Sequence, residues 1–148
     1  MLNEDEVIFE LKEYLIKKDW IVFSYKSPGG HGGITIRLND NKSIVPDMVA
    51  FKNGFILCIE AKAEYSKEDE QKLDSLFSNE RYLQYFNESC LTILKSMGLH
   101  FQENLTFIKT IAYSKGTETP PDFVTLKVNE SNNIKTTIGK AILHVPLV

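Results

Sequence analysis

PDMVAFKNGFILCIEAK, residues 46–62, is the stretch of sequence that decides the fold of this chain. It holds two apolar runs, Met48–Phe51 and Phe55–Ile59, which are separated by Lys52-Asn53-Gly54. An Asn-Gly pair between two such runs is typical of a tight β-hairpin, because Asn and Gly tolerate the positive φ angles of its turn. The stretch therefore predicts two antiparallel strands, the first beginning and the second ending at the same edge of a sheet.

Polar residues mark the two ends of this hairpin. Asp47 lies near the start of the first strand, and Glu60 and Lys62 lie near the end of the second. Side chains alternate between the faces of a strand, so Glu60 and Lys62 share one face and Ala61 points to the other. The sequence therefore predicts that two carboxylates and a lysine converge on one small volume at the edge of an apolar sheet.

This set of groups suits the metal-assisted hydrolysis of a phosphodiester. Mg²⁺, with Mn²⁺ as a substitute, prefers oxygen ligands, activates water and polarises phosphoryl oxygens. We expect Asp47 and Glu60 to hold the metal, with the Ala61 carbonyl as a further ligand. Lys62 supplies a positive charge that orients the nucleophile or offsets charge on the phosphate. The alternative is a surface hairpin on which Glu60 and Lys62 form an ordinary ion pair worth under ~1 kcal/mol.

Composition limits the class of protein. With 148 residues, of which 43% are apolar, the chain can bury one hydrophobic core, so we expect a single domain over 1–148. The acidic N-terminus is unlike a secretory signal, and no apolar stretch approaches the length of a membrane span. Two cysteines, Cys58 and Cys90, do not make a disulfide framework, so we expect an intracellular, cytoplasmic protein. The net charge of −3 is unusual for a protein that binds nucleic acid, because affinity for phosphates comes largely from basic residues.

Periodicity and capping signals place further elements around the hairpin. Asn3 with Glu6 resembles a capping box, and Ser66 with Asp69 marks the start of a second helix. We expect helices from Asn3 to about Lys18, over Lys67–Phe77 and over Glu80–Met97, and strands over Trp20–Tyr25, Ile34–Leu38, Ile44–Phe51, Phe55–Lys62, Leu105–Tyr113, Phe123–Val128 and Thr137–Val145. This order predicts an α/β or α+β domain with a central mixed sheet flanked by helices.

With Pro46-Asp47 and Glu60-Ala61-Lys62 on the two arms of one hairpin, the chain resembles the PD-(D/E)xK nuclease superfamily. That superfamily includes restriction endonucleases, Holliday-junction resolvases and the virus-type replication-repair nucleases. The resemblance implies a restriction-endonuclease-like αβββαβ core over about 4–114, followed by a C-terminal β extension over about 115–148. It also implies Mg²⁺-dependent hydrolysis of DNA, with Asp47 and Glu60 as metal ligands and Lys62 positioning the attacking water.

The resemblance points to residues on two helices near this centre. Family members often add an acid from the first helix, and here Glu6 and Glu10 are both candidates, one helical turn apart. Gln71 lies at the start of the second helix, where some relatives carry a glutamine that supports the site. The alternative for each of these residues is a solvated position on a helix surface.

The glycine-rich loop between the first helix and the hairpin is a further candidate. His31 lies there between Gly30 and Gly32, and the resemblance to resolvase-like members implies that this loop approaches the substrate. The alternative is a connection between strands with an exposed histidine. We therefore expect Gly30, His31 and Gly32 to bind substrate, together with Gln71.

These expectations combine into a magnesium-dependent endodeoxyribonuclease that acts on duplex or branched DNA. A homodimer is expected, because cutting both strands of a duplex with one small site per chain requires two copies. The alternatives are a subunit with the nuclease fold that binds or assembles within a restriction or repair complex without cutting, and a nuclease for branched DNA or RNA. The sequence identifies neither the DNA sequence nor the DNA structure that is recognised, and it assigns no role to the segment after Lys115.

Overall fold

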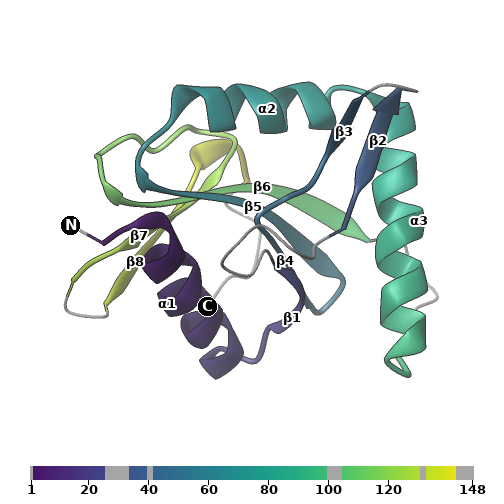
Figure 1. The fold of residues 1–148 in the computed structure, drawn as a ribbon, viewed down its shortest axis with the longest axis horizontal. Coiled ribbons are helices and arrows are strands. Elements are labelled where there is room, and N and C mark those ends of the chain that lie inside the picture. Colours follow the sequence, from purple (N-terminus) through teal and green to yellow (C-terminus); the bar gives the residue numbers. More distant parts are fainter. Residues whose placement is uncertain (1, 26–33, 40–41, 100–104, 131–132, 143–148) are drawn as a thin grey trace.

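The computed structural model describes residues 2–25, 34–39, 42–99, 105–130 and 133–142, and a mixed six-stranded sheet forms its centre (Figure 1). The strands lie in the order β1-β4-β5-β6-β7-β8. They are β1 (Ile21–Tyr25), β4 (Met48–Lys52), β5 (Phe55–Glu64), β6 (Thr106–Lys115), β7 (Val124–Val128) and β8 (Ile134–Ile138). β5, β6 and β7 run parallel to one another, and the other neighbouring pairs are antiparallel. The predicted α+β domain with a mixed sheet flanked by helices is confirmed.

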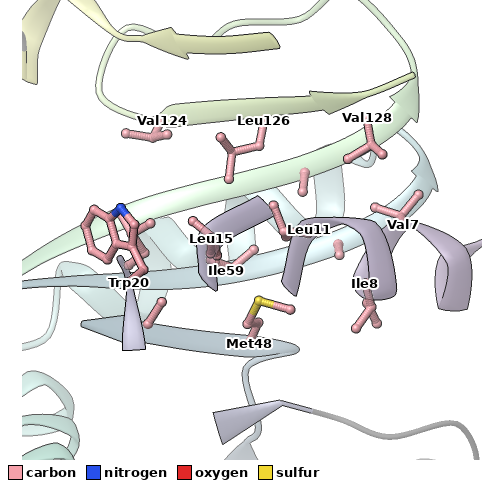
Figure 2. Close-up of a cluster of buried hydrophobic side chains, with 14 of the residues drawn as sticks. Val7, Ile8, Leu11, Leu15, Trp20, Met48, Ile59, Val124, Leu126 and Val128 are labelled. Carbon is pink, nitrogen blue, oxygen red and sulfur yellow. The ribbon is translucent and has the colours of Figure 1, made fainter. Parts of the chain in front are cut away.

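Helices cover both faces of the sheet. α1 (Glu4–Lys17) lies on one face, and α2 (Lys67–Phe77) and α3 (Glu80–Ser96) lie on the other (Figure 1). Figure 2 shows the first face, where Leu11 and Leu15 of α1 lie close to Ile59 of the sheet. Each of these side chains is buried, and full burial of a leucine contributes about 1.5–3 kcal/mol to folding. The second face is built from buried residues of α2 and α3, namely Leu73, Leu76, Phe86, Cys90 and Leu94.

The helix starts follow their predicted caps. The Asn3 side chain accepts the N–H of Glu6, and the Glu6 side chain accepts the N–H of Asn3, which makes the predicted capping box. The Ser66 hydroxyl accepts the N–H of Asp69 at 3.3 Å and begins α2. Within the described part of the chain, no helix is both long enough and apolar enough to cross a membrane.

The predicted hairpin is present as β4 and β5. Asn53 and Gly54 have φ angles of 51° and 84°, the positive values that a tight turn requires. The register pairs Lys52 with Phe55 beside the turn and Met48 with Ile59 at the far end. The turn chemistry therefore fixes which residues of the two strands face each other.

The prediction of one strand over Ile44–Phe51 is wrong. Its first residue ends β3 (Lys42–Ile44), which pairs with β2 (Ile36–Asn39) in a separate two-stranded sheet. The strand of the central sheet begins only at Met48. Pro46 lies between the two segments, and a proline has no N–H to donate to a strand ladder, so the chain changes sheets there.

The last predicted strand, Thr137–Val145, is also wrong in its bounds. β8 begins earlier, at Ile134, and a short 3-10 helix over Lys140–Ile142 follows it, while residues 143–145 lie outside the described residues. Gly139 explains why β8 ends at Ile138. Its N–H donates to the Phe123 carbonyl, and its Cα lies against the backbone of Pro121. A Cβ at Gly139 would lie 2.2 Å from the Pro121 carbonyl oxygen.

This close approach predicts that Gly139→Ala destabilises the protein. The added methyl group meets backbone atoms that must shift, so the free energy of unfolding should fall by about 1–3 kcal/mol. Denaturant unfolding followed by circular dichroism measures the change. The exposed neighbour offers a control, since Lys140→Ala should stay within about 0.5 kcal/mol of the parent protein. Equal stability of the two variants would contradict the close packing of Gly139.

Candidate active site

The hairpin register brings Asp47 and Glu60 together at one edge of the sheet. Met48 pairs with Ile59, so the next position along the antiparallel pair sets Asp47 level with Glu60. The Ala61 N–H donates a hydrogen bond of 2.8 Å to Oδ2 of Asp47 across the two chain segments. Both acidic residues are almost fully buried, at 3% and 2% exposure. Two carboxylates thus lie side by side inside an apolar sheet edge, as the sequence predicts.

The side chains of β5 alternate between the two faces of the sheet as predicted. Ala61 belongs to the core beneath α1, whereas Cys58, two positions before Glu60, belongs to the core beneath α2 and α3. Because residues two apart on a strand share a face, Glu60 and Lys62 lie on the α2 side of the sheet. The Ala61 N–H is engaged with Asp47, and the role of its carbonyl as a metal ligand stays a prediction.

The surroundings of Glu60 favour its protonated form. Burial is the largest cause, followed by the negative charge of Asp47 and a hydrogen bond between the two side chains, and together they raise the pKa of Glu60 to about 8. Lys72 of α2 opposes this effect with its Nζ atom 2.7 Å from Oε1 of Glu60. The contact departs from ideal hydrogen-bond angles, so Lys72 compensates Oε1 chiefly through its positive charge. A metal cation at this point would compete with Lys72 for that oxygen.

Lys62 lies at the mouth of the site and is surrounded by acids. Its Nζ atom is 3.7 Å from Oε1 of Glu4, and its side chain is 42% exposed. Burial alone would lower the pKa of Lys62, but four carboxylates outweigh it and raise the pKa above its usual value. They belong to Asp69, Glu4, Asp47 and Glu60. Lys62 is therefore held in its charged form beside the carboxylate pair.

The acid of α1 that contacts Lys62 is Glu4, whereas Glu6 and Glu10 are the acids that the sequence suggested. Glu6 accepts the Asn3 N–H in the capping box, and Glu10 lines a shallow hollow with Phe9 on the outer side of α1. Glu4 lies three residues before Val7 and four before Ile8, so it shares the helix face that these two buried residues turn toward the sheet. From that face it reaches Lys62. The amphipathic spacing of α1 carried this signal, although sequence reasoning missed it.

Sequence reasoning also missed two residues of α2. Asp69 and Lys72 lie at helical spacing from the buried Leu73 and Leu76, so they face the sheet. Burial, the largest cause, raises the pKa of Asp69, and the nearby Lys62 opposes this effect. Gln71, the expected supporting residue, is exposed on the opposite side of α2. The substrate-binding candidates Gly30, His31 and Gly32 lie outside the described residues.

The carboxylate pair fits a hard divalent cation. Among the described residues, no group of three or more His, Cys, Asp or Glu side chains is arranged to hold a metal ion. Mg²⁺ nevertheless is commonly bound through one or two carboxylates, with water and substrate phosphate completing its shell. Asp47 and Glu60 supply such a pair of buried oxygen ligands, and the Lys72 ammonium against Glu60 shows that positive charge is favoured there.

Comparisons with known proteins do not identify a relative. No protein-family model matches the chain, and neither the curated proteins nor the solved structures contain a significant match. The geometry of the site is therefore the basis for a functional proposal.

The raised pKa of Glu60 predicts a characteristic pH dependence in metal-free protein. A carboxyl group whose pKa rises on folding contributes stability below its unfolded pKa of 4.5, and this contribution is lost as the pH rises through about 8. Glu60→Gln stays neutral, so with EDTA its melting temperature should exceed that of the parent at pH 9 and differ less at pH 5. Thermal unfolding across this range measures the effect. Glu64→Gln, an exposed change on the same strand, should keep the parental profile, and a parental profile for Glu60→Gln would contradict the assignment.

The ion pair of Lys72 with Glu60 predicts competition with a bound metal. Removing the ammonium in Lys72→Gln should tighten Mn²⁺ binding on the order of tenfold, equal to ~1.4 kcal/mol, because one positive charge leaves the ligand. Isothermal titration calorimetry measures the dissociation constant. Lys67→Gln is the matched control on the same helix, since Lys67 pairs with Glu70 away from the site. Unchanged affinity in Lys72→Gln would show that Lys72 and the metal do not compete.

Proposed function

We propose that this chain is a Mg²⁺-dependent endonuclease that hydrolyses phosphodiester bonds in DNA. The observation that carries the proposal is the pair of buried carboxylates, Asp47 and Glu60, set side by side with the Lys72 ammonium against Glu60 and with Lys62 next to them. Burying two acids is costly unless a cation or a proton compensates them. Lys72 supplies one positive charge to the two carboxylates, so the pair can still attract a further cation.

The topology supports a restriction-endonuclease-like fold. α1 is followed by β1, β4 and β5 as an antiparallel run, then by α2 and α3, and then by β6 parallel to β5. This order is similar to the αβββαβ core of PD-(D/E)xK nucleases if β2 and β3 are an insertion between the first two strands. β7 and β8 then extend the same sheet as additional C-terminal strands.

Each group of the site has a role in the proposed reaction. Asp47 and Glu60 hold the metal, which when bound supplies positive charge that polarises the phosphodiester and acidifies water. The Ala61 N–H fixes the Asp47 carboxylate in position. Lys62, held in its charged form, orients the attacking water and offsets the negative charge that grows on the phosphate. A homodimer of such chains would place two sites on the two strands of a duplex.

A second candidate function is a subunit that keeps the nuclease fold and binds or assembles without cutting. Lys72 favours it, because an internal ammonium at 2.7 Å from Glu60 compensates part of the buried charge without a metal. Calorimetric titration with Mg²⁺ and Mn²⁺ separates the two candidates. Binding that disappears in Asp47→Asn supports the nuclease, and no binding to the parent protein supports the subunit.

The nuclease proposal predicts that Asp47→Asn and Lys62→Met each lower the rate of DNA cleavage by at least about 100-fold, because ligand and charge stabilisation are lost. Purified protein is assayed with Mg²⁺ on duplex, branched and single-stranded DNA, and circular dichroism checks the fold of each variant. Glu6→Gln and Glu10→Gln are matched acid-to-amide controls outside the site and should cleave at the parental rate. Full activity in a folded Asp47→Asn or Lys62→Met protein would refute the catalytic assignment.

A further inference from the structure

Three lysines and a tyrosine form one row across four neighbouring strands. The register pairs Lys62 with Tyr113, Tyr113 with Lys127, and Lys127 with Lys135. Directly paired residues of neighbouring strands point to the same face of a sheet, so the four side chains lie on the face that carries Glu60. With strands about 4.8 Å apart, this row extends about 14 Å from Lys62 toward the β8 edge. We call these residues the lysine row.

Folding alone does not explain the outer half of the lysine row. Lys127 and Lys135 lie directly opposite each other on β7 and β8, and like charges in that position destabilise a sheet. Among the described residues neither lysine has an ion-pair partner. An anion bound across the two side chains would turn this repulsion into attraction.

A hollow adjoins the row at the carboxyl ends of β6 and β7. It has a volume of about 560 Å³ and is lined by Lys127, by Lys115, and by the uncharged side chains of Thr117 and Asn129. Glu118 and Glu130 also line the hollow and balance Lys115 and Lys127, so Lys135 adds a positive charge beyond that balance. Tyr113 is buried beneath this surface and donates a hydrogen bond of 2.5 Å to the Glu118 carbonyl, which holds the adjoining turn in place.

We propose that the lysine row binds the phosphate backbone of the DNA strand that enters the active site at Lys62. The inference rests on the proposed nuclease function and names the surface that positions its substrate. A length of about 14 Å is enough for the row to reach more than one phosphate of a single strand, because successive phosphates of a strand advance by only ~3.4 Å along the helix axis. Lys62 thus contacts the scissile phosphate, and Lys127 and Lys135 contact phosphates further along the same strand.

The salt dependence of binding tests this row. The double variant Lys127→Gln, Lys135→Gln is made in an Asp47→Asn background, so that DNA is bound and not consumed. Fluorescence anisotropy with a labelled duplex measures the affinity between about 50 and 200 mM salt, and each lost phosphate contact lowers the slope of log K against log salt by about one. We expect the slope to fall by about two. Lys17→Gln, Lys95→Gln is the control with the same charge change, because both exposed lysines end helices near the opposite edge of the sheet.

The outcomes separate the lysine row from the nuclease proposal. A slope that falls in the row variant and not in the control supports the row, even if the parent protein cuts no DNA and the nuclease proposal fails. An unchanged slope, an equal fall in both variants or the absence of DNA binding by the Asp47→Asn protein overturns the row, whatever the cleavage assay shows. Thermal unfolding checks that the row variant is folded, and it should be at least as stable as its background because the repulsion between Lys127 and Lys135 is removed.

Discussion

The register of one hairpin is the constraint on which the candidate site depends. The positive φ angles of Asn53 and Gly54 fix the turn, and the turn sets Met48 opposite Ile59. A shift of one residue would send every side chain of β5 to the other face of the sheet. Glu60 would then point into the apolar core under α1, far from Lys72. The hairpin register therefore determines both the packing of the two apolar layers and the pairing of Asp47 with Glu60. Neither can change without the other.

The buried carboxylates at this sheet edge lower the stability of the fold. Asp47 accepts the Ala61 N–H, which satisfies one of its oxygens, and Oε1 of Glu60 pairs with the Lys72 ammonium. Replacing such groups by apolar ones often stabilises a fold, so buried acids mark a place where stability has been given up. The surrounding strands tolerate the cost because the layers under α1 and α2 bury large apolar side chains on both sides. That cost in stability supports the proposed function of the site.

Features that depend on residues close together in the sequence were predicted correctly. The hairpin turn, the Asn3 capping box and the Ser66 cap are set by residues a few positions apart, and all three are present in the structure. The strand over Ile44–Phe51 was wrong because its residues are apolar throughout, and only Pro46 marks the change of sheet. The last strand was misplaced because Gly139 is constrained by Pro121, which is distant in sequence.

The residues of the candidate site also differ in whether neighbours in the sequence or distant segments bring them together. Asp47, Glu60 and Lys62 could be predicted because one hairpin carries them, while Lys72 required knowing which face of α2 meets the sheet. Strand pairing also aligns Lys62 with Lys127 and Lys135, although no window of sequence holds all three. A net charge of −3 averages over this arrangement, because acids gather at the carboxylate pair and lysines continue the row beyond it. Under the proposed function, the metal offsets those acids and the row draws a phosphate backbone toward them. Binding to a polyanion then depends on how charge is distributed along the sheet edge, and the sign of the average carries little information about it.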